Sequence, residues 1–366
     1  MLNLYTIKRV AEIIDVPADV LTHIADNTEK YVRHKTLYDP TRPDRPNKRP
    51  RPVISILGDW RRIQTRLHKR VFAPRLETSP ISYGGVSGRD TKMNALAHSK
   101  HSFLYVADIS NFFPSVSNNR VFRLFQQLNC SPSVARLLTK LCTYDYHLAI
   151  GLITSPILSD QVLYPVDQRL IQLCNKFSKT EVIATRFVDD IAISSHFDLE
   201  HTFVERIIRK IMRSSGLRLK EEKEDCGRID RGMPITQIRV RHGRADVTKQ
   251  YMTELERMIN DHRDLANGLS FNGPLLTSST LEGKVHHACR INPGRKRNLW
   301  RQFRSIRWDN LWWNARLMGL VAAEKTLVPR GANPPDFSKA YSDGIRTPQS
   351  SFGSQVSVDV DQEPPF

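Results

Sequence analysis

Cysteine is scarce in this chain of 366 residues, and long apolar runs are missing from it. The five cysteines are scattered without CxxC spacing, which excludes a zinc site built on paired cysteines and a disulfide framework. No apolar run approaches the ~18 residues that a membrane span requires. The first residues, MLNLYTIKRVAEIIDV, lack a signal-peptide core and cleavage site. We therefore predict a cytoplasmic protein with reduced thiols and no membrane partner.

Acidic residues are also few, with 38 Asp and Glu against 55 Lys and Arg. The resulting net charge of +17 favours a polyanionic partner, most often a nucleic acid. The alternative is a protein that only has a basic surface. The length of the chain suggests two or three subdomains rather than one small core.

Apolar periodicity and capping residues predict mixed helices and strands in irregular order. Helices are predicted over 5–34, 58–73, 117–129, 131–142, 156–177 and 198–215, and strands over 101–110, 181–188 and 191–195. Ser117 and Ser131 are the predicted caps of the helices that begin at these positions. An extended basic loop is predicted over 38–53, helices over 249–325, and disorder over 326–366. This order of elements indicates an α+β fold.

Three aspartates stand at the ends of predicted strands. Asp189 and Asp190 are adjacent in RFVDDIAIS, and Asp108 ends the apolar run of HSFLYVADIS. Adjacent carboxylates are costly to bury unpaired, although an Asp-Asp pair alone can also be a turn or a helix cap. Three carboxylates from two neighbouring strands suit two divalent cations about 3.5–4 Å apart, either Mg²⁺ or Mn²⁺. On a basic protein, such a site indicates phosphoryl transfer on nucleic acid.

Four stretches of the chain resemble, in order, the palm motifs of reverse transcriptases. They are VADISNFFPSV (106–116), GLITSPILSDQVLYPVDQRL (151–170), RFVDDIAIS (186–194) and GLRLKEEKE (216–224). NALAH (94–98) and LEGKVHHACRINPGRKRNL (281–299) are similar to segments of bacterial retron-type and related defence-associated members. The chain departs from the family pattern at Ile150, where glutamine is usual, and at Gln237, where glycine is expected.

The resemblance implies a right-hand polymerase fold of fingers, palm and thumb, with an antiparallel palm sheet and a helical thumb. It divides the chain into an N-terminal helical segment (1–37), a basic loop and fingers (38–100), the palm (101–245, with finger helices at about 117–150), the thumb (246–325) and a disordered tail (326–366). It implies an RNA-directed DNA polymerase that uses dNTPs to copy a dedicated non-coding RNA template and primer into cDNA, in anti-phage defence. An effector protein or a second copy of the chain is a partner that it leaves open.

The resemblance also assigns catalytic residues. Asp108, Asp189 and Asp190 would be catalytic and would bind the metal ions. The main-chain carbonyl of Ile109 would be a further metal ligand. Lys223 would donate a proton to pyrophosphate or would simply neutralise it.

Nucleotide selection is assigned in the same way. Phe113 would be a steric gate against a 2′-hydroxyl, with Phe112 as the adjacent alternative. An RNA-templated RNA polymerase is disfavoured for this reason. The other predicted dNTP contacts are Lys48, Arg51, Gly151, Ser155 and Pro156.

The segment that resembles the thumb contains a candidate RNA-binding surface. Basic residues alternate with four tryptophans over 295–313, so that one helix face can meet phosphates, although tryptophans at helical spacing can also be core. The predicted RNA contacts are Asn94, His98, Arg297, Arg301 and Arg304, and for the first two a structural role is the alternative. The rival function for the whole chain is a non-catalytic RNA-binding scaffold on a polymerase fold.

Overall fold

The computed structural model describes residues 1–37, 51–177, 181–199, 203–241 and 243–320. The chain divides into two compact units, Met1–Ala245 and Asp246–Phe366, the second described up to residue 320. The predicted tail over 326–366, Lys48 and most of the predicted basic loop lie outside the described residues. In the part of the chain that is described, no helix is long and apolar enough to cross a membrane.

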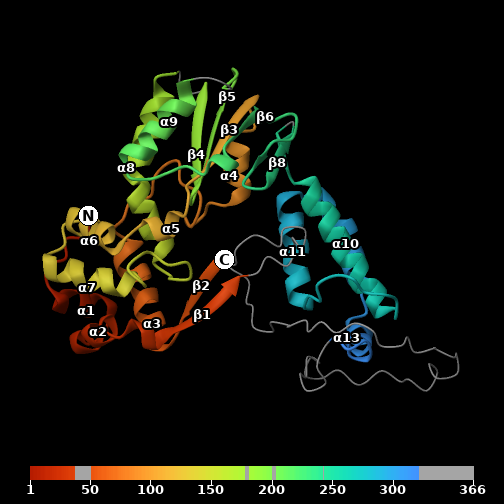
Figure 1. Ribbon diagram of the computed structural model, residues 1–366, viewed down its shortest axis with the longest axis horizontal. Helices are drawn as coiled ribbons and strands as arrows, with labels where there is room; N and C mark the ends of the chain where they lie inside the picture. The colour runs from red at the N-terminus through yellow and green to blue at the C-terminus, as the bar shows by residue number, and fades with distance from the viewer. Residues whose placement is uncertain (38–50, 178–180, 200–202, 242, 321–366) are drawn as a thin grey trace. The chain divides into compact units, whose positions relative to one another are not determined.

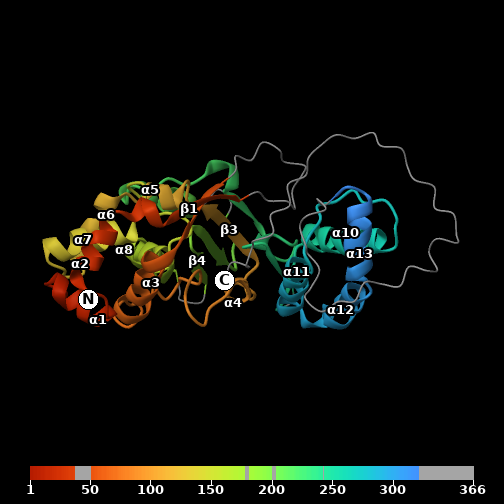
Figure 2. The ribbon, with the colours of Figure 1, turned by 90° about the horizontal axis from the view of Figure 1, so that it is seen from below.

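A four-stranded antiparallel sheet in the first unit carries the predicted catalytic aspartates (Figure 1). Its strands are, in order, β4 (Val182–Phe187), β5 (Asp190–Ser195), β3 (Phe103–Asp108) and β6 (Asp225–Arg228). Most residues of β3 and β5 are buried, as expected for central strands that are covered on both faces. Two helices that pack against β4 lie on either side of it in both views, α8 (Ser155–Asn175) and α4 (Thr91–Ala97) (Figures 1 and 2).

Helices from two distant parts of the sequence form a second layer of this unit. Those that pack together are α1 (Ile7–Ile14), α2 (Ala18–Ala25), α6 (Asn118–Gln127) and α7 (Pro132–Cys142) (Figure 2). The hydroxyls of Ser117 and Ser131 accept hydrogen bonds from main-chain N–H groups at the starts of α6 and α7, which confirms both predicted caps. The nearby elements are η1 (Thr28–Tyr31), β1 (Val32–Leu37), β2 (Arg51–Ile56), α3 (Gly58–Arg66), the π-helix η2 (Leu67–Phe72) and α5 (Phe112–Ser115).

The last part of the first unit consists of one helix and several short elements. These are α9 (Phe203–Ser214), η3 (Glu221–Lys223), β7 (Pro234–Ile235), β8 (Ile238–Arg241) and β9 (Arg244–Val247), which leads into the second unit. The second unit contains α10 (Lys249–Ala266), α11 (Ser278–Ile291), η4 (Pro293–Arg295), α12 (Lys296–Arg304) and α13 (Trp308–Leu317). Helices and antiparallel sheets together confirm the predicted α+β class.

The single helix predicted over 5–34 is wrong, because this segment forms two short helices and the start of a strand. The first helix ends at Ile14, Pro17 precedes α2, and β1 begins at Val32. Proline interrupts a helix because its ring clashes with the preceding turn and because it has no N–H to donate. The strand forms because β1 pairs along its whole length with β2, whose first residues were predicted to belong to the extended loop.

His98 joins α4 to the sheet as a fully buried group. Its Nδ1 lies 2.6 Å from the Ser194 hydroxyl and its Nε2 lies 2.7 Å from the Thr185 hydroxyl. Burial, assisted by neighbouring His101, lowers the pKa of His98 to about 3. The imidazole is therefore neutral in the folded protein at pH values where the unfolded chain would already bind a proton.

Stability should consequently fall as the pH is lowered from about 6.5 towards 3. Above 6.5 neither state binds the proton, and below it only the unfolded state does, so the free energy of unfolding should decrease by about 1.4 kcal/mol per pH unit from this group. Urea unfolding at several pH values would measure the slope. His98→Gln should reduce it, whereas the same substitution at exposed His23 should leave it as in the wild type. Equal slopes in all three proteins would contradict the assignment.

Candidate active site

The sheet brings the three aspartates together. Asp108 ends β3 and lies opposite Asp190, the first residue of β5, in the antiparallel register. Asp189 precedes it in the two-residue turn between β4 and β5, and the N–H of Ile109 donates to its carbonyl at 3.0 Å. Each aspartate offers a carboxylate oxygen, and these oxygens all lie within 4.8 Å of one another. The predicted convergence of carboxylates at strand ends is therefore present.

The electrostatics of this cluster call for a cation. Burial, together with the carboxylates of Asp189 and Asp108, raises the pKa of Asp190 to about 7. The ammonium of Lys223 forms an ion pair with Asp108, so one cationic group already lies beside the cluster. Three carboxylates that repel one another form an all-oxygen donor set, which fits a hard divalent cation such as Mg²⁺ or Mn²⁺.

A cavity of about 290 Å³ opens beside the cluster. Asp108, Asp189, Lys223, Phe113 and Ile150 are among the residues that line it, so the sequence motifs meet around one space. Lining residues that the sequence analysis missed are His34, Tyr144, Asp145, His147 and Lys220. His34 and Tyr144 lie 3.2 Å apart at Nε2 and the hydroxyl, although they are far apart in sequence. Neither lies in a motif, so no sequence signal marks them.

The two adjacent phenylalanines have different environments. Phe112 is almost fully buried, whereas Phe113 is only partly buried and borders the cavity with its ring 5.5 Å from that of Phe112. Phe112 also lines the cavity, but its burial fits a core role. The steric-gate role of Phe113 stays a prediction that this placement permits.

The turn before α8 needs a correction. The Ser155 side chain is buried and its hydroxyl donates to the carbonyl of Ala149 at 2.8 Å, so it stabilises the turn, and Ser155 is not among the residues that line the cavity. Gly151 has φ +110, and a Cβ there would lie 1.8 Å from the carbonyl oxygen of Ile54. The close approach that demands glycine is therefore to strand β2. Pro156 packs against Gly85, because a Cβ added to Gly85 would lie 2.8 Å from the Cβ of Pro156.

The predicted RNA contacts in α4 also need a correction. His98 is fully buried and both ring nitrogens already have hydroxyl partners, so it is a structural residue and cannot reach RNA. Asn94 is buried too, and its Nδ2 donates to the Thr236 hydroxyl at 3.2 Å. It borders a second cavity of about 220 Å³ that Asp108 and Asp190 also line. Arg51 is the first residue of β2.

The second unit presents a basic hollow around α12. An open cavity of about 1750 Å³ is lined by exposed cations, namely Arg290, Lys296, Arg297, Arg301 and Arg304. Trp300 also lines it, with the Arg304 guanidinium 5.4 Å above its ring and His286 edge-on at 4.7 Å between centroids. Of the four tryptophans over 295–313, only Trp313 is exposed, and the other three are partly buried. Trp300 and Trp308 both pack against the buried ring of Phe303, so their rings contribute to the packing of the second unit.

Comparisons with known proteins agree with this geometry. Residues 43–230, just over half of the chain, match the family described as "Reverse transcriptase (RNA-dependent DNA polymerase)". The chain is 28% identical to the Retron Se72 reverse transcriptase of Salmonella heidelberg over 56% of its own length and 55% of that protein.

Two relatives from Escherichia coli are similarly distant. The Retron Ec86 reverse transcriptase is 26% identical over 49% of this chain and 54% of that protein, and the Retron Ec73 reverse transcriptase is 26% identical over 67% and 81%. The chain thus spans about half the length of the Se72 and Ec86 relatives. With its motifs assembled around one carboxylate cluster, the chain belongs to the reverse transcriptase family and is similar to the retron-type members.

Proposed function

We propose that the chain is an RNA-directed DNA polymerase that copies a non-coding RNA into cDNA. The observation that carries the proposal is the convergence of Asp108, Asp189 and Asp190 beside a cavity that Phe113 and Lys223 also line. Family membership supports the reaction type, and the names of the retron relatives support a template of the retron kind. The net charge of +17 suits a nucleic-acid substrate.

The residues at the site have separable tasks in this proposal. The three carboxylates would hold Mg²⁺ or Mn²⁺, and the carbonyl of Ile109 is a proposed further ligand. When bound, such ions supply activation of the attacking 3′-hydroxyl and charge stabilisation on the leaving pyrophosphate. Lys223, already next to Asp108, can hold a proton where pyrophosphate departs. The Phe113 ring would close the space that a 2′-hydroxyl needs.

Incorporation of labelled dNTPs by the purified chain on an RNA template with a DNA or RNA primer tests the proposal. Activity should require Mg²⁺ or Mn²⁺ and should be lost with EDTA, because the carboxylates alone repel the incoming phosphates. Binding of RNA without incorporation under any metal condition would favour the rival scaffold function instead. The RNA that co-purifies with the chain from its host would identify the template.

A biological role and a partner are proposed from the resemblance alone. The cDNA would serve anti-phage defence, together with an effector protein or a second copy of the chain. Plaque counts on hosts that carry the wild-type gene or an inactive variant would test the role. Equal counts would argue against it.

The basic hollow around α12 is the proposed RNA-binding surface of the second unit. Replacing Arg297, Arg301 and Arg304 by glutamate should weaken RNA binding strongly at low salt. The slope of log affinity against log salt should become shallower by about 2–3 units, because fewer counterions are released. Filter binding at several salt concentrations would measure both effects.

The control for this variant reverses three exposed cations of the first unit that give the same change in net charge, namely Lys8, Arg9 and Lys30. It should retain most of the affinity and slope. If both triple variants lose affinity equally, RNA affinity depends on net charge and not on the arginines of the basic hollow. If neither loses affinity, the arginines only coat a solvated face.

A further inference from the structure

The turn that carries Asp189 has a backbone conformation that its sequence disfavours. Val188 joins β4 to this turn with φ +58, in the left-handed region. Valine is β-branched, and for such residues this region is a steric outlier. Turns of two residues between antiparallel strands require positive φ, which glycine or asparagine supplies without strain. Contacts from outside the turn must therefore hold Val188 in place.

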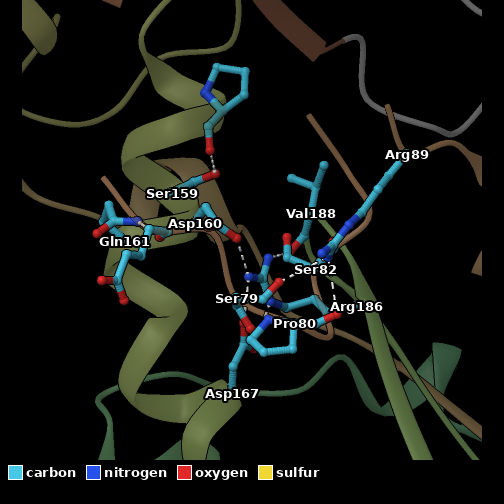
Figure 3. A network of polar contacts seen from close by, with 12 residues as sticks. Ser79, Pro80, Ser82, Arg89, Ser159, Asp160, Gln161, Asp167, Arg186 and Val188 are labelled. Carbon is cyan, nitrogen blue, oxygen red and sulfur yellow. Dashed lines mark hydrogen bonds and ion pairs between the residues drawn. The ribbon is translucent and has the colours of Figure 1, made fainter. Parts of the chain in front are cut away.

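The side chain of Arg186 supplies such a contact (Figure 3). Its Nη1 donates to the carbonyl oxygen of Val188 at 3.0 Å. Its Nε and Nη2 donate to the carboxylate of Asp167 in α8 at 2.8 and 2.7 Å, and Nη2 also donates to Asp160 in the same helix at 2.7 Å. The carbonyl of Val188 belongs to the peptide that leads into Asp189, so the guanidinium fixes this peptide against helix α8.

The arginine is itself rigidly placed. Its main chain donates to Ile81 and accepts from Tyr83, both at 2.7 Å, so the segment before α4 lies along the end of β4. The side chains of Arg186, Asp160 and Asp167 are 1%, 6% and 0% exposed. Burial raises the pKa of Asp167, and the guanidinium opposes that shift.

Stability alone does not account for this arrangement. A buried ion network is often no more stable than a well-packed apolar cluster of the same volume. An apolar cluster, however, cannot donate to the carbonyl of Val188. A planar guanidinium can bind two carboxylates and a carbonyl at the same time, whereas the single ammonium of lysine cannot match that fork.

We propose that Arg186 is a positioning residue for the metal-binding carboxylates. Held by Asp160 and Asp167, it fixes the left-handed peptide of Val188 and thereby aims Asp189 at Asp108 and Asp190. The inference deepens the proposed function and rests on it where catalysis is concerned. The orientation of the carboxylates for a divalent cation can be measured without catalysis.

Titration of the full chain with Mn²⁺, monitored by electron paramagnetic resonance, measures the metal affinity that depends on this orientation. Arg186→Lys keeps the charge that Asp160 and Asp167 require but loses the fork. Its Mn²⁺ dissociation constant should rise about tenfold or more, as for other residues that orient metal ligands. Asp160→Asn, a milder change that leaves Asp167 as an anchor, should shift the constant in the same direction by less.

Arg66→Lys is the matched control. Arg66 also donates to main-chain carbonyls, those of Ile14 and Asp15, which belong neither to the catalytic turn nor to the segment that holds Arg186. Its loss should lower thermal stability and leave the Mn²⁺ constant at the wild-type value. Unchanged Mn²⁺ affinity in folded Arg186→Lys and Asp160→Asn, or an equal loss in Arg66→Lys, would overturn the proposal.

Second-site rescue separates positioning from packing. Glycine adopts positive φ without steric cost, so adding Val188→Gly to Arg186→Lys should recover much of the Mn²⁺ affinity. Equal losses in the single and double variants would place the effect of Arg186 in packing and overturn the proposal. If the wild type binds Mn²⁺ yet incorporates no dNTP, the proposed polymerase function fails, while the affinities still decide the role of Arg186.

Discussion

Asp189→Asn and Asp108→Asn are each expected to reduce dNTP incorporation by about 10³-fold or more, because each removes several kcal/mol of metal-dependent transition-state stabilisation. The asparagine amide keeps the size of the side chain but loses the negative charge and one metal-binding oxygen. The structure places both carboxylates in one cluster with Asp190, so the loss of either one removes a ligand from the same metal site. Primer extension with Mg²⁺ and with Mn²⁺ would measure the loss.

The thermal midpoint of these variants distinguishes lost chemistry from lost folding. Repulsion among the three carboxylates contributes to the raised pKa of Asp190, so removal of one charge should leave the metal-free protein as stable as the wild type or more stable. Asp230→Asn is the control, since Asp230 is an exposed aspartate that pairs with Arg228 in the same unit. It should retain full activity. Full activity in folded Asp189→Asn would remove the two-metal assignment.

The parts of the site that could be predicted from sequence are those that follow from one strand or one helix end. One apolar run ends at Asp108 and another begins after Asp190, so the sequence predicts two strand ends. These ends meet because the two strands pair in antiparallel fashion. Ser117 and Ser131 announce helix starts by the same local logic, because a capping hydroxyl acts within three residues.

Contacts between distant segments could not be predicted in this way. The strand β1 forms only because β2 pairs with it, and Gly151 is needed because the carbonyl of Ile54 lies against it. His34 lines the cavity together with Tyr144, which is 110 positions away in the sequence. The resemblance predicts a dNTP contact for Ser155 and an RNA contact or a structural role for His98. In the structure both side chains are buried and hydrogen-bonded within the protein, as structural residues are.

The departure from the family at Gln237 has a structural answer. Gln237 has φ +64 and Thr236 has φ +46, so both residues of this tight turn lie in the left-handed region. The backbone therefore keeps the conformation for which glycine is expected, although it has side chains that disfavour it. Thr236 accepts a hydrogen bond from Asn94, which ties the turn to α4 beside the carboxylates.

Sugar selection gives the second large effect, and Phe113→Val should reveal it. The ring borders the cavity that Asp108 and Asp189 also line, so a smaller side chain should leave room for a 2′-hydroxyl. The preference for dNTPs over rNTPs, measured as the ratio of kcat/KM values, should fall by about 10–100-fold. The rate with dNTPs should change much less, because the carboxylates are untouched.

Phe112→Val is the matched comparison, since it makes the same change one residue earlier in the chain. Phe112 is 2% exposed, so its truncation should cost on the order of 2 kcal/mol of stability by leaving a cavity in the core. Its dNTP preference should stay near that of the wild type, because the ring does not supply the exposed edge at the cavity. An altered preference in Phe112→Val but not in Phe113→Val would move the gate to Phe112. An unchanged preference in both folded variants would mean that sugar selection depends on other residues lining the cavity, with Tyr144 the next aromatic side chain to test.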